Sequence, residues 1–440
     1  MRSPLELATA ADRPCTPHQH RRRRPRFTLA SGVLLSTLPL VGQDAGNDGS
    51  SAREWIGGAP PWQWTRLTGD WGGLRTELEE RGIELAGGLV WDWSAAWRGG
   101  ARNRATLGAL LDANLTFDLE RLCGLPRTIV YFDAYSIQGR DPSDDVGDIQ
   151  GFSNLQAPDT EQLAEAWVET WVSEQVRVKF GKVDFNSEFA FTEEGGEFVN
   201  SSAAITPTIV GYPTYPDPAT SLDLFWTPNE FWHIGLGVFD GAGAYGVRTG
   251  RHGLRGFFND DDGDAYLTVF EIGHGWIGGQ RWGSGRLAIG GYHHSAHFDR
   301  FDGGTQHGAS GAYAVLDQRV WRENPTDAED GQGIGLMAYV GCGDANVAAI
   351  ARHVEVGATW TGALDGRDDD VFGLLVTHAV LTDEAGAGFD GDETAIELFY
   401  KLQLTPALSL KPDLQWLLNP GGDPTLEDAL VGTLRIEASL

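Results

Sequence analysis

The strongest constraint in this sequence is a period of two residues, which begins at Ile83 and continues to the C-terminal end. In residues 394–405, for example, Ile396 and Leu398 face one side of an extended strand, whereas Glu397 faces the other. Alternation over segments of about ten residues is typical of strands that cross a membrane with apolar side chains toward lipid and polar ones toward a wet lumen. The pattern therefore predicts an all-β chain.

A soluble β-sandwich also alternates, but three further features favour a closed, antiparallel outer-membrane β-barrel. The segments are longer than the strands of soluble sheets, charges recur on their inward faces, and long connections alternate with short ones. No stretch of about eighteen apolar residues is present, which excludes an α-helical membrane protein. We expect about sixteen strands, starting near residues 83, 106, 127, 163, 176, 221, 231, 264, 284, 311, 331, 350, 369, 392, 408 and 428.

The N-terminal region predicts export. Five arginines between residues 21 and 26 precede an apolar stretch at 27–41, which is the order of a secretory signal. We assign residues 1–43 to the signal peptide, with cleavage after Gln43 or Ala45 both open, and 44–65 to a flexible leader. Residues 66–82 contain a short periplasmic helix, with Asp70 as N-cap and Gly82 after its end. Residues 83–440 form the barrel.

Composition narrows the functional classes. The formal net charge of −29 argues against nucleic acid as a partner, since phosphate binding needs a basic face. Cys123 and Cys342 remain outside the signal, and their spacing does not settle whether they pair.

Several patterns resemble enzyme or metal sites but lack the surroundings that such sites require. The glycines follow a barrel-like strand and open no helix, and the histidines fall in a predicted loop without a fourth ligand. The acidic run is out of register with a calcium loop, and acids on one strand face are expected in a hydrated pore. These patterns are Gly241, Gly243 and Gly246; His293, His294 and His297; Asp260, Asp261, Asp262 and Asp264; and the pair Glu165 and Glu169.

Residues 163–180 combine the groups that a sugar pore needs, namely hydrogen-bonding side chains and aromatic faces that bind weakly. Two acids and two tryptophans share one face of the first segment, and two bases share one face of the next. If the apolar face meets lipid, opposed charges in the lumen would orient hydroxyl dipoles; the alternative is that the tryptophans belong to an interfacial girdle. The following long connection, 185–220, is expected to fold inward and narrow the channel, or else to form a plain extracellular loop.

Seven motifs, in order over residues 66–440, resemble the carbohydrate-selective porins of the OprB type. The resemblance implies a sixteen-stranded pore for passive diffusion of monosaccharides and similar small solutes. Two departures are the final residue, Leu440, where such porins usually end in an aromatic, and more acidic loops. The motifs are Gly69-Asp70-Trp71-Gly72-Gly73-Leu74-Arg75, Gly181-Lys182-Val183-Asp184-Phe185-Asn186-Ser187-Glu188-Phe189 with Asn200-Ser201, Val238-Phe239-Asp240-Gly241, Ala314-Val315-Leu316-Asp317-Gln318, Ile396-Glu397-Leu398-Phe399-Tyr400, Lys411-Pro412-Asp413-Leu414-Gln415 and Asn419-Pro420-Gly421-Gly422.

The resulting hypothesis is an outer-membrane porin for carbohydrates such as glucose, with no enzymatic activity, cofactor or metal. The alternatives are a general or cation-preferring porin, suggested by the acidic balance, and an outer-membrane barrel hydrolase. Its expected partners are small sugars, outer-membrane lipid, the outer-membrane assembly machinery and two further copies in a homotrimer. The predicted channel-lining residues are Glu165, Trp167, Glu169, Trp171, Arg177, Lys179, Asp184, Asn186, Glu188, Glu397, Lys401, Lys411, Asp413, Gln415 and Arg435.

Overall fold

A computed structural model describes residues 59–155, 157–251, 265–279, 282–326 and 330–440. The expected signal peptide, most of the leader and the acidic run from Asp260 to Asp264 lie outside the described residues. None of the described helices is both long enough and apolar enough to cross a membrane.

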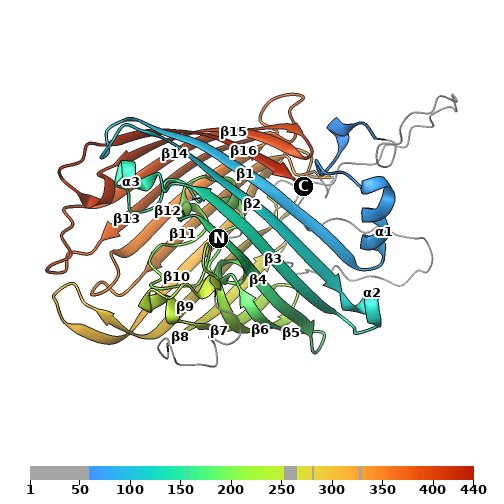
Figure 1. Ribbon diagram of the computed structural model, residues 1–440, viewed down its shortest axis with the longest axis horizontal. Coiled ribbons are helices and arrows are strands. Elements are labelled where there is room, and N and C mark those ends of the chain that lie inside the picture. Colours follow the sequence, from blue (N-terminus) through green and yellow to red (C-terminus); the bar gives the residue numbers. More distant parts are fainter. Residues whose placement is uncertain (1–58, 156, 252–264, 280–281, 327–329) are drawn as a thin grey trace.

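The described chain forms a closed barrel of sixteen antiparallel strands, in which each strand pairs with its neighbours in sequence and β1 pairs with β16 (Figure 1). This confirms the predicted fold class. The strands are β1 Ile83–Arg98, β2 Ala105–Asp118, β3 Thr128–Gly139, β4 Thr160–Trp171, β5 Val176–Val183, β6 Ala219–Asn229, β7 Trp232–Asp240, β8 Tyr266–Trp276, β9 Gly285–Asp299, β10 Thr305–Arg322, β11 Gly333–Cys342, β12 Ile350–Thr361, β13 Val371–Leu381, β14 Glu393–Thr405, β15 Leu408–Leu418 and β16 Ala429–Ser439.

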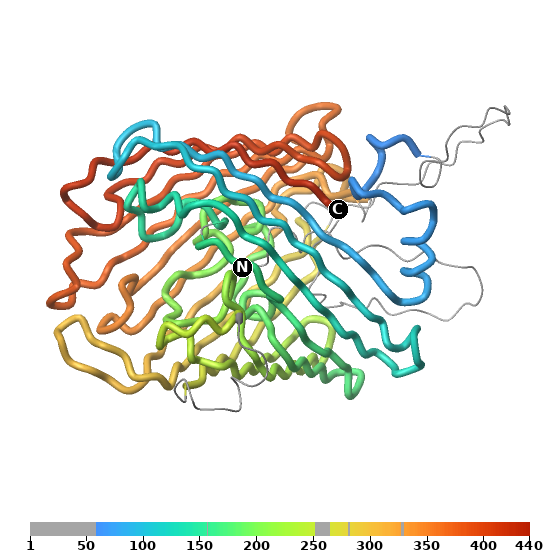
Figure 2. Tube along the Cα trace, in the orientation of Figure 1, coloured from blue at the N-terminus to red at the C-terminus, as the bar shows by residue number. Residues whose placement is uncertain are grey.

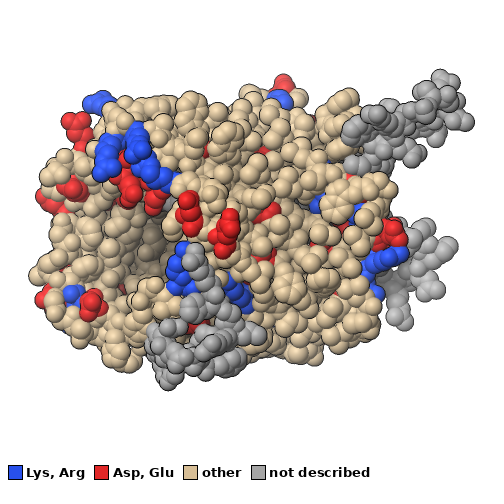
Figure 3. All heavy atoms as spheres, in the orientation of Figure 1, with Lys and Arg blue, Asp and Glu red and all other residues tan. Residues whose placement is uncertain are grey.

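The period of two residues separates a lipid-facing surface from an inward-facing one. On β14 and β15, Leu398 and Trp416 are exposed on the outer surface, whereas Glu397 and Gln415 are fully buried inside. The visible surface is mostly uncharged, and Lys, Arg, Asp and Glu gather at the loop end, near the middle of the view and beside α1 (Figure 3). An apolar outer surface around a polar interior is the arrangement that a bilayer requires of a barrel.

The largest error in the predicted strand starts concerns β10, which begins at Thr305 rather than near residue 311. The prediction that His293, His294 and His297 lie in a loop is also wrong, because all three are in β9. Strands β9 and β10 each continue beyond the apolar residues that mark them in the sequence. Strand β10 also contains a bulge at Gly308, where φ is +79°. A bulge inserts one residue and shifts the alternation, which hides the strand from a pattern of period two.

A short helix, α1 (Leu74–Glu80), packs at the end of the barrel where β16 finishes (Figure 2). Its N-cap is Gly73 rather than Asp70; the Asp70 carboxylate instead accepts hydrogen bonds from the backbone and side chain of Thr76. Arg75 is buried and its Nη2 donates to the backbone oxygen of Leu440 at 2.9 Å. Burial lowers the pKa of Arg75 to about 10, which leaves it charged at neutral pH. The helix thus fastens the seam between β1 and β16.

The connections differ between the two ends of the barrel, most clearly in the first half. Residues 140–159 and 184–218 are long connections at one end, whereas 172–175 and 230–231 form short turns at the other. The contrast weakens in the second half, where 323–332 is longer than 300–304. The short helices are η3 Pro61–Gln63, η4 Trp71–Gly73, α2 Leu119–Cys123, α3 Ser143–Val146, α4 Phe185–Glu188, η5 Glu194–Glu197, η6 Ser201–Ala203, η7 Ala242–Tyr245, η8 Thr249–Arg251 and η10 Pro420–Gly422.

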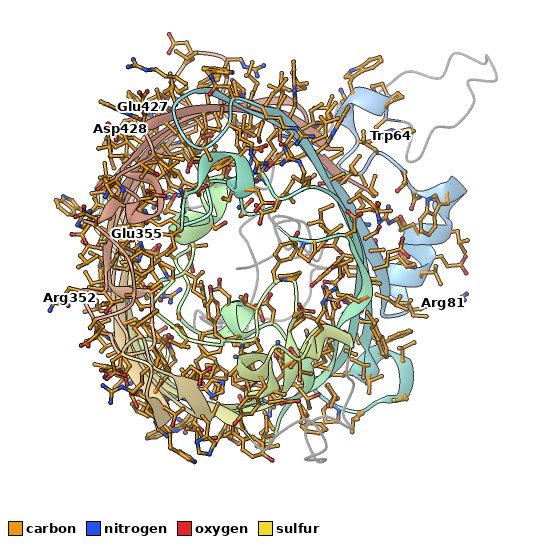
Figure 4. All side chains as sticks on the ribbon, turned by 60° about the vertical axis from the view of Figure 1, so that its left-hand side comes forward. Trp64, Arg81, Arg352, Glu355, Glu427 and Asp428 are labelled. Carbon is orange, nitrogen blue, oxygen red and sulfur yellow. The ribbon has the colours of Figure 1, made fainter. Side chains whose placement is uncertain are left out.

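Two of the long loops fold into the barrel. We call residues 140–159 loop L2 and residues 184–218 loop L3. Seen from the loop end, green segments of L3 lie inside the ring of strands (Figure 4). Phe185, Phe189 and Phe198 of L3 are fully buried, as is Phe152 of L2. The inward fold expected of the long connection is therefore present, and L2 shares it.

Candidate functional site

Opposite charges from two strands and L3 meet on the inner wall. Arg177 of β5 donates from Nη1 to Glu169 of β4 at 2.7 Å and from Nη2 to Glu188 of α4 at 2.6 Å. Lys179 of β5 donates to the other oxygen of Glu188 and lies 3.4 Å from Glu169. We call Glu169, Arg177, Lys179 and Glu188 the charge cluster. Its two acids and two bases pair directly with one another. Of the two acids predicted beside these bases, Glu169 belongs to the cluster, whereas Glu165 accepts from the indole of Trp167 and from the backbone of Asp184.

The charge cluster is ordered by the register of β4 and β5. Glu169 is opposite Lys179, and Trp171 is opposite Arg177, so these four side chains share the inward face. Trp167 is opposite Gly181, where a Cβ atom would lie 2.6 Å from the Cα of Trp167. A glycine is therefore needed at position 181 for the two strands to pack here.

Trp167 faces inward and contacts both an aromatic ring and a cation. Its indole stacks on Tyr131 of β3 with ring centroids 4.8 Å apart, and the Nζ of Lys179 lies 3.7 Å from its ring centroid. Its Nε1 donates to Glu165 at 3.1 Å. These contacts rule out a lipid-side girdle position for Trp167, and a cation–π contact of this kind stabilises by about 1–2 kcal/mol when desolvated.

The pKa of Glu188 shows how strongly its two bases act on it. Burial alone raises the pKa of this carboxyl, but Arg177 and Lys179 outweigh burial and lower it to about 2. Removing a single partner of such a buried pair leaves an uncompensated charge, which costs about 3–5 kcal/mol. The cluster therefore fixes the start of L3 against β4 and β5 over the ordinary pH range.

Asp184 and Asn186, also predicted to line the channel, build the base of L3 instead. The Asp184 carboxylate accepts hydrogen bonds from the backbone of Asn186 and Tyr215 and from the hydroxyl of Thr214. The side-chain amide of Asn186 donates to backbone oxygens within the loop. Asp184 thus joins the outgoing and returning ends of L3.

The candidates on β14, β15 and β16 face inward, but most of them are covered by loops. Glu397, Lys411, Gln415 and Arg435 are at most 1% exposed, and Asp413 is buried as well. Glu397, Lys411, Gln415 and Arg435 contact loop residues, and Asp413 accepts a hydrogen bond from Gln415 of its own strand. In this structure these five side chains leave little surface for a passing solute to contact. Lys401 is the exception, since it retains 15% of its side-chain surface while donating to Glu197 of L3 at 3.0 Å.

Arg435 of β16 connects the barrel seam to L2. It donates two hydrogen bonds of 2.7 Å to the Asp92 carboxylate of β1, and a third to Asn154 of L2. A two-pronged contact between a guanidinium and a carboxylate fixes the orientation of both groups. Lys411 of β15 similarly donates to Glu437 and to the backbone oxygen of Glu197.

A family model described as carbohydrate-selective porin, OprB family, matches residues 102–440. The chain belongs to this family. Porin B of Pseudomonas aeruginosa is 24% identical over 88% of this chain and 94% of its own length. A high-pH structure of OprB from Pseudomonas putida has a TM-score of 0.77 at 20% identity, covering 86% of this chain and 99% of that one. A low-pH structure of the same protein has a TM-score of 0.57.

As a member of the OprB family, the chain is a carbohydrate-selective porin of the outer membrane and a channel rather than an enzyme. Among the described residues, no group of three His, Cys, Asp or Glu side chains is placed to hold a metal ion, and Cys123 and Cys342 are free. Gly241 and Gly246 flank the four-residue 3-10 helix η7, and Gly243 lies within it.

Sequence reasoning missed several acids that this porin uses to hold its loops. Asp317 of β10 accepts from the backbone of Glu193, and Glu271 of β8 accepts from the backbone of Ala190. Glu393 was missed because it is the first residue of β14. Glu197 was missed because it lies in a loop without periodicity. An inward-facing acid on a strand is the available signal, but it does not identify the loop that the acid holds.

Proposed function

We propose that this OprB-family porin passes monosaccharides such as glucose by passive diffusion along the charge cluster and Trp167. The observation that carries the proposal is the inward-facing indole of Trp167 beside Glu169, which retains 14% of its side-chain surface. A sugar presents an apolar ring face to an aromatic side chain and hydroxyl groups to charged ones. Contacts of this kind are individually weak, which permits release as well as entry.

Other accessible inward-facing charges extend the proposed path around the loop. Glu197 of L3 and Lys401 of β14 retain 19% and 15% of their side-chain surface, and Glu437 of β16 retains 15%. Each of the three is paired with an opposite charge. Paired charges offer hydroxyl groups both donors and acceptors without a strong net field. The proposed lining is therefore Glu169, Trp167, Trp171, Glu197, Lys401 and Glu437.

The acidic composition supports a second candidate, a general or cation-preferring pore. The local charge distribution argues the other way, since the two acids and two bases of the charge cluster balance. A balanced constriction favours neutral solutes over ions, because no net field selects a cation.

The proposal has a direct test in purified protein reconstituted into liposomes. Swelling rates in isotonic solutions of a monosaccharide, a disaccharide and a trisaccharide should fall steeply with sugar size. Zero-current potentials in a salt gradient across a planar bilayer should show weak ion preference, and glucose should reduce the ion current. Strong cation preference without reduction by sugar would support the general pore and refute the proposal.

Assembly partners complete the proposed function. The wall carries exposed Trp91, Trp93 and Trp97 on β1, which would contact outer-membrane lipid or a neighbouring barrel. We propose a homotrimer inserted by the outer-membrane assembly machinery. Chemical cross-linking in native membranes should give a species of three chains, and a single-chain species throughout would refute the trimer.

A further inference from the structure

We propose that Glu393 and Glu397 of β14 are positioning residues that set the width of the sugar path, each by holding the backbone of one inward loop. The inference rests on the proposed function, because it concerns the same path. Neither side chain has accessible surface, so neither contacts a passing solute in this structure. Their contacts are instead with L2 and L3.

Glu397 holds L3. One carboxylate oxygen accepts from the backbone N–H of Val199 at 2.6 Å, and the other from that of Asn200 at 2.9 Å. The side-chain amide of Asn200 then donates to Gln415 on β15 at 3.1 Å. Two adjacent N–H groups on one carboxylate form a charge-assisted contact that fixes both the place and the direction of the loop backbone.

Glu393 holds L2 in the same manner. Its two oxygens accept from the backbone N–H groups of Ile149 and Gln150 at 2.9 and 3.0 Å, and from the side chain of Gln150 at 3.2 Å. The backbone of Gly421, in the last long connection, donates to it at 2.6 Å. Glu393 and Glu397 are four residues apart on one strand, so both carboxylates face the interior.

The two loops also bind each other, so the two carboxylates hold one unit. Ser201 N donates to the Gly151 oxygen at 2.7 Å, and Asn154 N donates to the Val199 oxygen at 2.7 Å. The Asn154 side chain adds a bond to the Phe198 oxygen. Loss of one carboxylate therefore loosens both loops in part, and loss of both frees the unit from β14.

The barrel itself does not depend on these side chains. Strand β14 pairs with β13 and β15 through backbone hydrogen bonds, which a change of side chain leaves in place. Removing the carboxylates instead leaves five loop backbone N–H groups without these acceptors, those of Ile149, Gln150, Val199, Asn200 and Gly421, and such groups recover partners only by moving toward water. The expected consequence is a wider and more variable path inside an intact wall.

The experiment uses the full-length porin and the variants Glu393→Ala, Glu397→Ala and the double variant. We expect higher single-channel conductance, larger current fluctuations and a loss of size discrimination between a monosaccharide and a trisaccharide in liposome swelling, greatest in the double variant. Glu397→Gln keeps one acceptor oxygen, so it should retain part of the discrimination. Heat-modified mobility on gels and the β-sheet circular dichroism should match those of the wild type.

Glu355 of β12 provides a matched control. It faces inward with 1% exposure, and neither carboxylate oxygen accepts a hydrogen bond from the described residues; its position on the inner wall is visible in Figure 4. Glu355→Ala should leave conductance and size discrimination unchanged. A folded double variant with unaltered conductance and discrimination would refute the inference, as would an equal effect of Glu355→Ala.

The outcomes also separate this inference from the proposed function. If the wild-type porin shows no dependence on sugar size, the monosaccharide path is refuted. Conductance then still reports whether the two carboxylates hold the loops.

Discussion

The two sides of the channel hold L3 by different means. At β4 and β5, the loop acid Glu188 forms salt bridges with Arg177 and Lys179. At β14, the wall acid Glu397 accepts hydrogen bonds from the backbone N–H groups of Val199 and Asn200. Substitutions of Arg177 and Lys179 alter the net charge near the path. Substitution of Glu397 alters the position of L3 and leaves the charges of the cluster paired. The comparison separates ion preference from pore width.

The largest expected effect comes from the double variant Arg177→Ala, Lys179→Ala. It leaves Glu169 and Glu188 without their bases, an uncompensated burial that costs about 3–5 kcal/mol for each broken pair. We expect a clear shift of the zero-current potential toward cation preference and weaker attachment of L3, with the barrel still assembled. An unchanged zero-current potential in a salt gradient would contradict the difference between the two sides.

A smaller effect is expected from Arg435→Lys. Lysine keeps the positive charge beside Asp92 but cannot reproduce the two parallel bonds and the third bond to Asn154. Loss of one such bond to a charged group costs about 1.5–3 kcal/mol. We expect noisier single-channel current with little change of ion preference. A large change of ion preference would show that Arg435, at the seam between β1 and β16, contributes to the electrostatic field along the path as the charge cluster does.

Trp167→Leu tests the sugar contact alone. Leucine removes the aromatic face and the contact with Lys179, an effect of about 1–2 kcal/mol, but retains the charges of the cluster. Glucose should therefore reduce the ion current less, while the zero-current potential stays close to the wild-type value. Titration of single-channel current with glucose measures this, and an unchanged glucose dependence would remove Trp167 from the proposed path.

The smallest effect concerns pH. Burial, together with Glu393, raises the pKa of Asp148 in L2 to about 7, whereas the pKa of Glu188 in L3 is lowered to about 2. An acid whose pKa is raised in the docked loop stabilises docking at low pH, and this contribution is lost as the pH rises toward 7. An acid whose pKa is lowered in the docked loop stabilises docking at neutral pH, and this contribution is lost as the pH falls toward 2. Between pH 5 and 8, the contribution of Asp148 to the docking of L2 should therefore fall, whereas the contribution of Glu188 to the docking of L3 stays constant.

Current fluctuations recorded across this pH range measure the effect. They should grow modestly with pH in the wild type and remain constant in Asp148→Asn. Equal pH dependence in the two proteins would contradict the assignment to Asp148.

The sequence predicted the wall well and the interior only in part, for a physical reason. Alternation is a local property, so the starts of strands such as β12 and β15 follow directly from it. Three members of the charge cluster, Glu169, Arg177 and Lys179, lie on adjacent strands joined by a short turn, so Glu169 and Lys179 could be placed together from the spacing. Glu397 and Val199, in contrast, are 198 residues apart, and the donor is a backbone N–H that every residue except proline carries. No side-chain pattern encodes such a contact.

The binding of loop backbone N–H groups by wall carboxylates affects how porins of this shape can diversify. A carboxylate that binds main-chain N–H groups does not distinguish which side chains the loop carries at 149 and 199, provided that neither is proline. Loop sequence can therefore change, by mutation or by design, while the attachment points on β14 stay fixed. New solute preferences become accessible through substitutions in the loops, without rebuilding the barrel that holds them.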